Sequence, residues 1–153
     1  MAVGIRSINV EDRTRAAEVA IRDGRAGRIS VPQMLRLLGA AQVLVPLADP
    51  PVMNDASVVR WKPATITKKA DGSQFVLAFT SKALIDAFSK GDPAHSFAFL
   101  VEVAWLLNVL PQAHGLVFNL GGTNGFEWPA SGIAAYNLNH DASYLAFERT
   151  RRE

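Results

Sequence analysis

Up to residue 40, the hydrophobic residues recur at the spacing of one helix face. In the stretch after Asn9, apolar positions three and four apart alternate with charged ones, which predicts a helix that Asn9 caps and that ends at Gly24. Its apolar positions are Ala16, Ala17, Ala20 and Ile21. A second helix begins at Ser30, where Gln33 three residues later completes a capping box. The two helices predict a helical hairpin over residues 9–39.

From residue 42 the pattern changes to short runs that are apolar throughout. QVLVPL (42–47) predicts a buried strand, and the following DPPVMND predicts a loop. VVRWKPATIT (58–67) and SQFVLAFT (73–80) flank the turn signal Asp71-Gly72 and predict a β-hairpin. Because proline cannot donate a hydrogen bond to a central ladder, Pro63 predicts that the first arm is an edge strand or is broken.

The second half of the chain predicts two more helices and a second hairpin. Thr80 or Ser81 caps a helix that ends near Gly91, with Phe79 in the core before it. Asp92-Pro93 predicts the start of a long helix up to Pro111, buried on most sides, so that Trp105 within it is shielded from solvent. GLVFNL (115–120) and FEWP (126–129) read as strands around GGTNG, followed by a short helix, SGIAAYN.

These elements predict an α+β fold with a mixed sheet of about four to five strands and helices mainly on one face. We expect one domain over residues 1–153. It comprises leading helices at about 9–39, a sheet-containing core at about 42–136 and a polar tail at about 137–153.

The composition is that of a globular protein of a reducing compartment. Hydrophobic residues make up 49% and charged residues 20% of the chain, and no apolar run approaches the length of a membrane span. Cysteine is absent, which excludes disulfides and thiolate chemistry. The first residues show no secretory signal pattern. The sequence therefore predicts a cytoplasmic protein that does not contact membranes.

The basic pI of 9.2 does not by itself indicate nucleic-acid binding. The net charge is only +2, with basic and acidic residues interspersed along the chain. Arg22, Arg25 and Arg28 form the nearest approach to a basic cluster, and a solvated loop between two helices explains them. Nucleic acid is therefore not an expected partner, although this stretch gives a third, weaker functional hypothesis.

The glycine-rich stretch GGTNG (121–125) resembles a site more than any other part of the chain. A phosphate-binding loop also needs a lysine followed by serine or threonine, and a dinucleotide fold needs a helix directly after the glycines. Here FEWP follows, so the glycines predict a hairpin turn. We expect no nucleotide and no cofactor.

No other combination of residues predicts catalysis or metal binding. The three histidines, His95, His114 and His140, lie far apart in the sequence and lack partners at metal-ligand spacing. Glu102 is a polar residue within an apolar stretch and could meet Glu127 in space, but solvent exposure explains it without a catalytic role. The sequence therefore predicts no catalytic residues and no metal site.

Three motifs resemble the N-terminal domain of the SseB family. They are VLVP (43–46), FVLAFTSKALIDAF (75–88) and LVFNLGG (116–122), and the resemblance extends over roughly residues 10–136. The family typically has Asn-Pro-Gly in the third motif, and here Leu120 takes the place of that proline. The resemblance implies a bacterial, secretion-associated protein with no established reaction, in a version without the second domain that members often carry.

Together these observations predict a non-enzymatic protein-binding module of a bacterial regulatory, secretion-linked or toxin-immunity system. The predicted interaction surface combines the 49–57 loop, two tryptophans and the glycine turn, because prolines restrict the loop and tryptophan is common at binding hot spots. Its candidate residues are Met53, Trp61, Gly122, Asn124 and Trp128. The alternative is a small-ligand-binding or enzymatic domain with a site near Gly121–Trp128.

Overall fold

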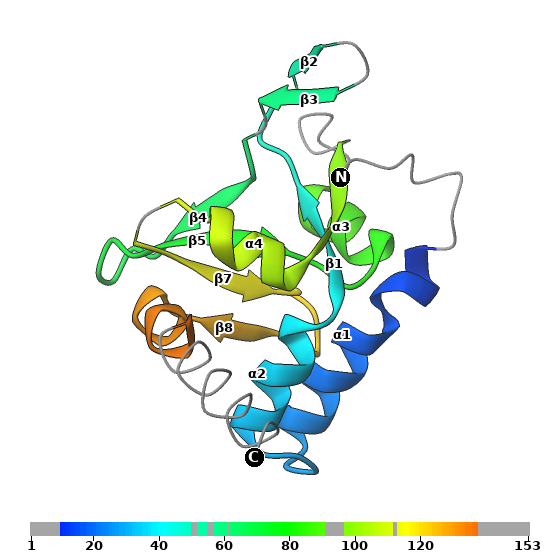
Figure 1. Cartoon of the computed structure of the whole chain (residues 1–153), viewed down its shortest axis with the longest axis vertical. Helices are drawn as coiled ribbons and strands as arrows, with labels where there is room; N and C mark the ends of the chain where they lie inside the picture. The colour runs from blue at the N-terminus through cyan, green and yellow to red at the C-terminus, as the bar shows by residue number, and fades with distance from the viewer. Residues whose placement is uncertain are drawn as a thin grey trace, which may run out of the picture.

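The computed structural model describes residues 10–49, 52–54, 57–60, 62–90, 97–111 and 113–137, with the backbone alone for 52–54 and 57–60. Figure 1 labels the elements, and a further helical segment covers residues 130–137. The helices are α1 (Val10–Arg25), α2 (Val31–Gly39), α3 (Lys82–Ser89) and α4 (Val103–Val109). The strands are β1 (Gln42–Pro46), β2 (Val52–Asn54), β3 (Ser57–Arg60), β4 (Thr65–Thr67), β5 (Gln74–Ala78), β6 (Ala98–Glu102), β7 (His114–Phe118) and β8 (Phe126–Trp128).

The predicted helical hairpin is present, with α1 and α2 packed side by side (Figure 1). Ser30 caps α2: its hydroxyl accepts a hydrogen bond from the Gln33 backbone N–H at 3.2 Å, and the Gln33 side chain accepts one from the Ser30 N–H at 2.9 Å. The capping box read from the sequence is therefore confirmed. Helix α1 ends at Arg25, one residue beyond the predicted Gly24. Asn9, its predicted cap, lies outside the described residues.

The main sheet is four-stranded and mixed, with the order β4-β5-β7-β8. Strands β5 and β7 run parallel, whereas β4 and β8 pair antiparallel to their neighbours. The predicted hairpin of β7 and β8 is confirmed, and the first hairpin is confirmed for β4 and β5, whereas residues 58–60 of its predicted first arm pair with β2 instead. Gly72 in the first turn has a φ of 75°. Pro63 interrupts the predicted first arm: it makes a single bridge to Leu47 and leaves β4 as a short edge strand.

Residues 98–102 form strand β6, so the long helix predicted from Asp92-Pro93 is wrong in its first half. Strand β6 pairs antiparallel with β1, setting Phe99 opposite Val45 and Val101 opposite Val43. Helix α4 begins only at Val103. A run that is apolar at every position carries no period, so tertiary pairing with β1 decided between helix and strand.

The segment predicted as a loop after residue 48 contains strand β2, which pairs with β3 in a small antiparallel hairpin. This hairpin extends from one end of the molecule (Figure 1).

Two apolar layers enclose the main sheet. Val76 and Ala78 of β5 point to one layer, which also contains core residues of α1, α2, α4 and the 130–137 helix. Phe75 and Leu77 point to the other, where Ile85 of α3 packs. The prediction of helices mainly on one face is confirmed. Strand β1 joins this sheet through reciprocal backbone hydrogen bonds between Leu44 and Phe79, both 2.8 Å.

Phe79 is fully buried, as predicted for a core residue. In the described part of the chain, no helix combines the length and the hydrophobicity that crossing a bilayer would need.

Candidate functional site

Asn119, at the end of β7, organises the glycine-rich connection to β8. Its side chain is buried, and its backbone adopts a left-handed conformation with φ of 54°, which asparagine tolerates better than most residues. The Asn119 Oδ1 accepts hydrogen bonds from the backbone N–H and the hydroxyl of Thr80, at 2.8 and 3.3 Å. Its Nδ2 donates to the carbonyl oxygen of Asn124 at 3.0 Å. Asn119 thus joins the start of α3 to the turn.

Helix α1 holds the same region at two points. The buried Thr14 hydroxyl lies within hydrogen-bond distance of the Thr80 carbonyl, and the Arg25 guanidinium donates to the Gly125 carbonyl at 2.6 Å. Thr80 therefore serves as a buried link to α1 and Asn119. The cap of α3 is Ser81, whose hydroxyl accepts from the Leu84 N–H at 3.2 Å.

The glycine stretch forms a hairpin turn, as predicted. Gly121 has a φ of 83°, which a side chain would strain, and β8 follows the turn as a strand. A hollow of about 320 Å³ lies beside the turn, with Arg25, Asn119 and Glu127 among its lining residues. Both Arg25 and Asn119 already make hydrogen bonds within the fold. The hollow therefore offers few uncommitted polar groups to a ligand.

Lys68, just after β4, and Glu127 on β8 form an ion pair that links the two outer strands of the main sheet across Phe75 of β5, with 2.6 Å between Nζ and Oε1. The hydrogen bond to Glu127 raises the pKa of Lys68. Nearby, hydrogen bonds from the Ser73 hydroxyl and backbone lower the pKa of Asp71. Glu102, the other carboxylate of the suggested pair, is exposed beside α4, as expected for a residue without a catalytic role.

Trp128 is 2% exposed, so its place in the predicted interaction surface is wrong. Strand β8 directs Trp128 into the helix-covered layer, where it packs edge-on against Tyr136 with ring centroids 5.0 Å apart. Its Nε1–H has no hydrogen-bond partner among the residues that the structure describes. Trp128 is therefore a core residue.

Trp105 is 38% exposed, so the prediction that it is shielded is also wrong. Because α4 begins at Val103, its inward face consists of Val103, Leu106 and Leu107, and Trp105 falls on the outward face. Val109, one turn later on that face, is 41% exposed, and Leu37 on α2 is 53% exposed.

A hollow of about 480 Å³ separates α2 from α4 and the 130–137 helix. Its apolar lining consists of small residues and one leucine, and its polar lining includes an arginine. The lining residues are Arg36, Gly39, Ala40, Ala104, Leu107, Asn108, Tyr136 and Asn137. The absence of a side chain at Gly39 allows the Tyr136 hydroxyl to approach α2 closely, because a Cβ at Gly39 would lie 2.8 Å from its oxygen. Burial raises the pKa of Tyr136, and the charge of Arg36 opposes this effect.

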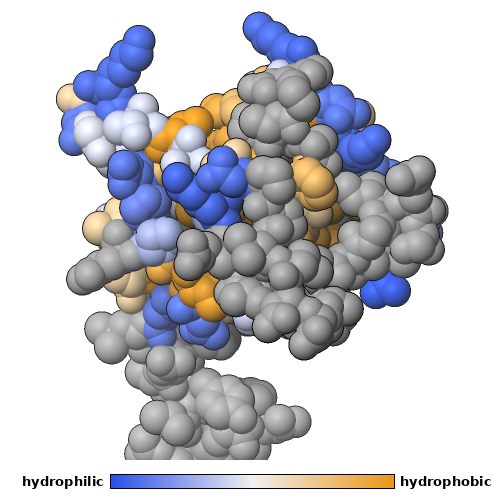
Figure 2. All heavy atoms as spheres, turned by 90° about the horizontal axis from the view of Figure 1, so that it is seen from above, coloured by the Kyte–Doolittle hydropathy of each residue, from blue (hydrophilic) through white to orange (hydrophobic). Residues whose placement is uncertain are grey.

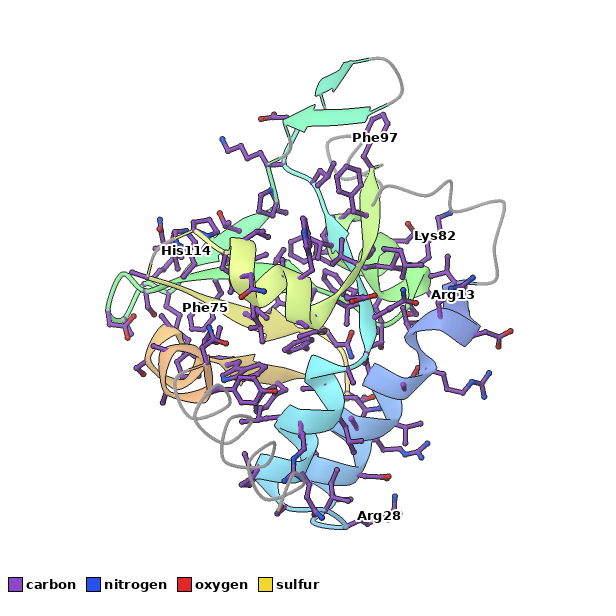
Figure 3. All side chains as sticks on the ribbon, in the orientation of Figure 1. Arg13, Arg28, Phe75, Lys82, Phe97 and His114 are labelled. Carbon is purple, nitrogen blue, oxygen red and sulfur yellow. The ribbon has the colours of Figure 1, made fainter. Side chains whose placement is uncertain are left out.

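Another exposed apolar residue, Phe97, lies away from these helices. Phe97, just before β6, is 45% exposed, and Figure 3 places it at the upper end of the molecule. Seen from above (Figure 2), hydrophobic residues reach the surface near the middle of this end, with hydrophilic residues on both sides.

Within the described ranges, no three histidine, cysteine, aspartate or glutamate side chains come together as a metal site would require. His114 lies at the start of β7. His95 and His140 lie outside the described residues.

A family model, the SseB protein N-terminal domain, matches residues 15–135. The chain belongs to the SseB family. No curated protein and no solved structure gave a significant match. In this SseB chain the three motifs noted in the sequence supply β1, the β5-to-α3 junction and the β7-to-β8 connection. Leu120, in place of the proline typical of SseB proteins, packs against the cluster on the α3 side of the sheet.

The residues predicted to form the interaction surface lie in different parts of this SseB domain. Gly122 and Asn124 lie in the β7–β8 turn, whereas Trp128 is in the core. The side chain of Met53 and all of Trp61 lie outside the described residues, so a surface shared by Met53, Trp61, Gly122 and Asn124 stays a prediction.

Sequence reasoning did not identify the Asn119 network or the hollow between α2 and α4. The signal for the first was present, since a polar residue followed by two glycines closes an otherwise apolar run. The second depends on how three helices pack, which no local pattern in the sequence of this SseB domain specifies.

Proposed function

We propose that this SseB-family chain is a non-enzymatic protein-binding module of a bacterial regulatory, secretion-linked or toxin-immunity system. One observation carries the proposal: the helices on either side of the hollow each expose large apolar side chains, Leu37 on α2 and Trp105 and Val109 on α4. Large apolar side chains left exposed on neighbouring helices are typical of protein interaction sites.

The arrangement around Gly121–Trp128 gives less support to the alternative, a ligand-binding or enzymatic site. The polar groups of Arg25 and Asn119 are engaged in holding the turn, and Glu127 pairs with Lys68. A reactive site normally keeps polar groups directed at the substrate, with pKa values matched to their task.

Site-specific photocrosslinking in the native host tests the proposal. A photoreactive amino acid is placed at position 37 or 109, at position 123 for the turn surface, and at the exposed position 87 of α3 as control. We expect one protein to crosslink from positions 37 and 109 and not from position 87.

The matched variants replace exposed apolar residues by serine. In a protein that carries the photoreactive amino acid at position 104, the double substitution Leu37→Ser and Val109→Ser should reduce recovery of the crosslinked partner. Phe97→Ser, equally exposed but away from these helices, should not. Equal yields from the α2–α4 positions and position 87 would refute binding through this face.

A further inference from the structure

We propose that the hollow between α2 and α4 receives an amphipathic helix of the partner protein, with a carboxylate side chain of that helix against Arg36. This inference rests on the proposed protein-binding function and specifies the chemistry of its partner.

The shape of the hollow supports a helix as the occupant. Gly39, Ala40 and Ala104 line it with small side chains, and Leu107 adds apolar surface. Small residues between two helices leave room for larger side chains of an incoming helix, which is the geometry of helix-in-groove recognition. An aliphatic side chain of the partner would contact Ala40, Ala104 and Leu107.

The charge of the hollow supports an acidic occupant. Arg36 is exposed, and none of the described carboxylates pairs with it. Three arginines of the neighbouring helix and loop do have such partners: Arg15 pairs with Asp12, and Arg22 and Arg28 pair with Asp23. A guanidinium beside apolar surface is suited to a carboxylate, which it can bind through two parallel hydrogen bonds.

The small number of cationic side chains in the hollow disfavours a nucleic-acid occupant. Arg36 is the one cationic side chain that lines this hollow. Nucleic-acid surfaces gather several lysines and arginines on one face, because each contacts a different phosphate.

The experiment selects helical peptides on the full-length chain. A displayed library of amphipathic helices is selected for binding to the wild-type protein, and the selected peptides are then tested on Ala104→Trp, which fills the hollow from an exposed position of α4. Ala87→Trp on α3, also exposed, is the matched control. Binding of the selected peptides, labelled with a fluorophore, is then measured by anisotropy.

We expect the selected peptides to contain a glutamate or aspartate next to an apolar face. Replacing that acid by glutamine should weaken binding to the wild type by up to about fivefold, as for a solvent-exposed ion pair. Arg36→Gln should remove this difference, and Arg36→Glu should favour a peptide with lysine at the same position. Ala104→Trp should abolish binding, whereas Ala87→Trp should leave it unchanged.

Three results would overturn the inference. The selected peptides could bind Ala104→Trp as well as the wild type, or show no preference for an acid in the wild type. A synthetic peptide of residues 138–153 could instead bind the hollow and compete, which would make this chain its own occupant. If the photocrosslinked partner is still recovered through positions 37 and 109 in any of these cases, the protein-binding function stands and only the inference about its helix fails.

Discussion

Asn119 combines two roles that different substitutions can separate. Its side chain accepts hydrogen bonds from Thr80, and its backbone occupies the left-handed region. Asn119→Gly keeps the backbone freedom and removes the acceptor from the buried Thr80 N–H, which should cost about 1–3 kcal/mol of unfolding free energy. Asn119→Ala should cost about 1–2 kcal/mol more, because alanine is strained at positive φ.

Urea denaturation of the three proteins measures this difference in unfolding free energy. If alanine and glycine at position 119 proved equally destabilising, backbone strain would contribute nothing there.

The junction between β5 and α3 allows a second comparison of neighbouring residues. Phe79→Ala should lower the unfolding free energy by about 3–5 kcal/mol, because it removes a fully buried ring and leaves a cavity. Ser81→Ala removes only the cap of α3 and should cost about 0.5–2 kcal/mol.

The order of these two effects is the test, and thermal or urea unfolding of both variants measures it. A Phe79→Ala protein as stable as the wild type would show that the ring is not a core residue.

At the scale of elements, the β7–β8 connection should not bind nucleotides. The turn lacks a phosphate-binding lysine, and Arg25 already donates to Gly125. Millimolar ATP, GTP or NAD should therefore leave the melting temperature unchanged, since a ligand that binds the native state would raise it.

Differential scanning fluorimetry with increasing nucleotide measures this melting temperature. A dose-dependent rise that disappears in a folded Gly125→Val variant would contradict the prediction.

Elements with local signals could be predicted from the sequence, and elements that depend on distant partners could not. Ser30 and Gln33 specify the start of α2 through contacts three residues apart, and the Asp71-Gly72 signal specifies its turn. Strand β6 instead depends on β1, in a register that sets Val101 opposite Val43, 58 residues earlier in the chain. The apolar residues of β6 are compatible with a helix or a strand, and only pairing with β1 selects the strand.

At the scale of the whole molecule, the tryptophans should report the packing of the helices on the sheet. In single-tryptophan variants, acrylamide should quench Trp105 efficiently and Trp128 weakly, because their exposed fractions are 38% and 2%. Trp61 is replaced by phenylalanine in both variants.

Steady-state and lifetime quenching of the two variants measures this accessibility, and a urea-unfolded sample gives the fully accessible limit. Equal quenching of Trp105 and Trp128 in the native proteins would contradict the packing of β8 against the 130–137 helix.

The candidate site could be predicted only in part for the same reason as the fold. The turn geometry at Gly121 follows from local composition, whereas the exposure of Trp105 and the burial of Trp128 depend on where α4 begins and on which face of β8 the helices cover. Hollows between helices, such as that beside Arg36, arise only once all three helices are packed.

The hydrogen bonds from α1 to the distant turn also bear on how the protein is made. Thr14 contacts Thr80, 66 residues away, and Arg25 contacts Gly125, 100 residues away. At a ribosomal rate of 5–20 residues per second, Arg25 waits about 5–20 s before its partner is synthesised. Helices α1 and α2 and strand β1, which packs on α1, therefore emerge well before β5, β7 and β8 of the main sheet, and a nascent-chain chaperone has that interval in which to bind them.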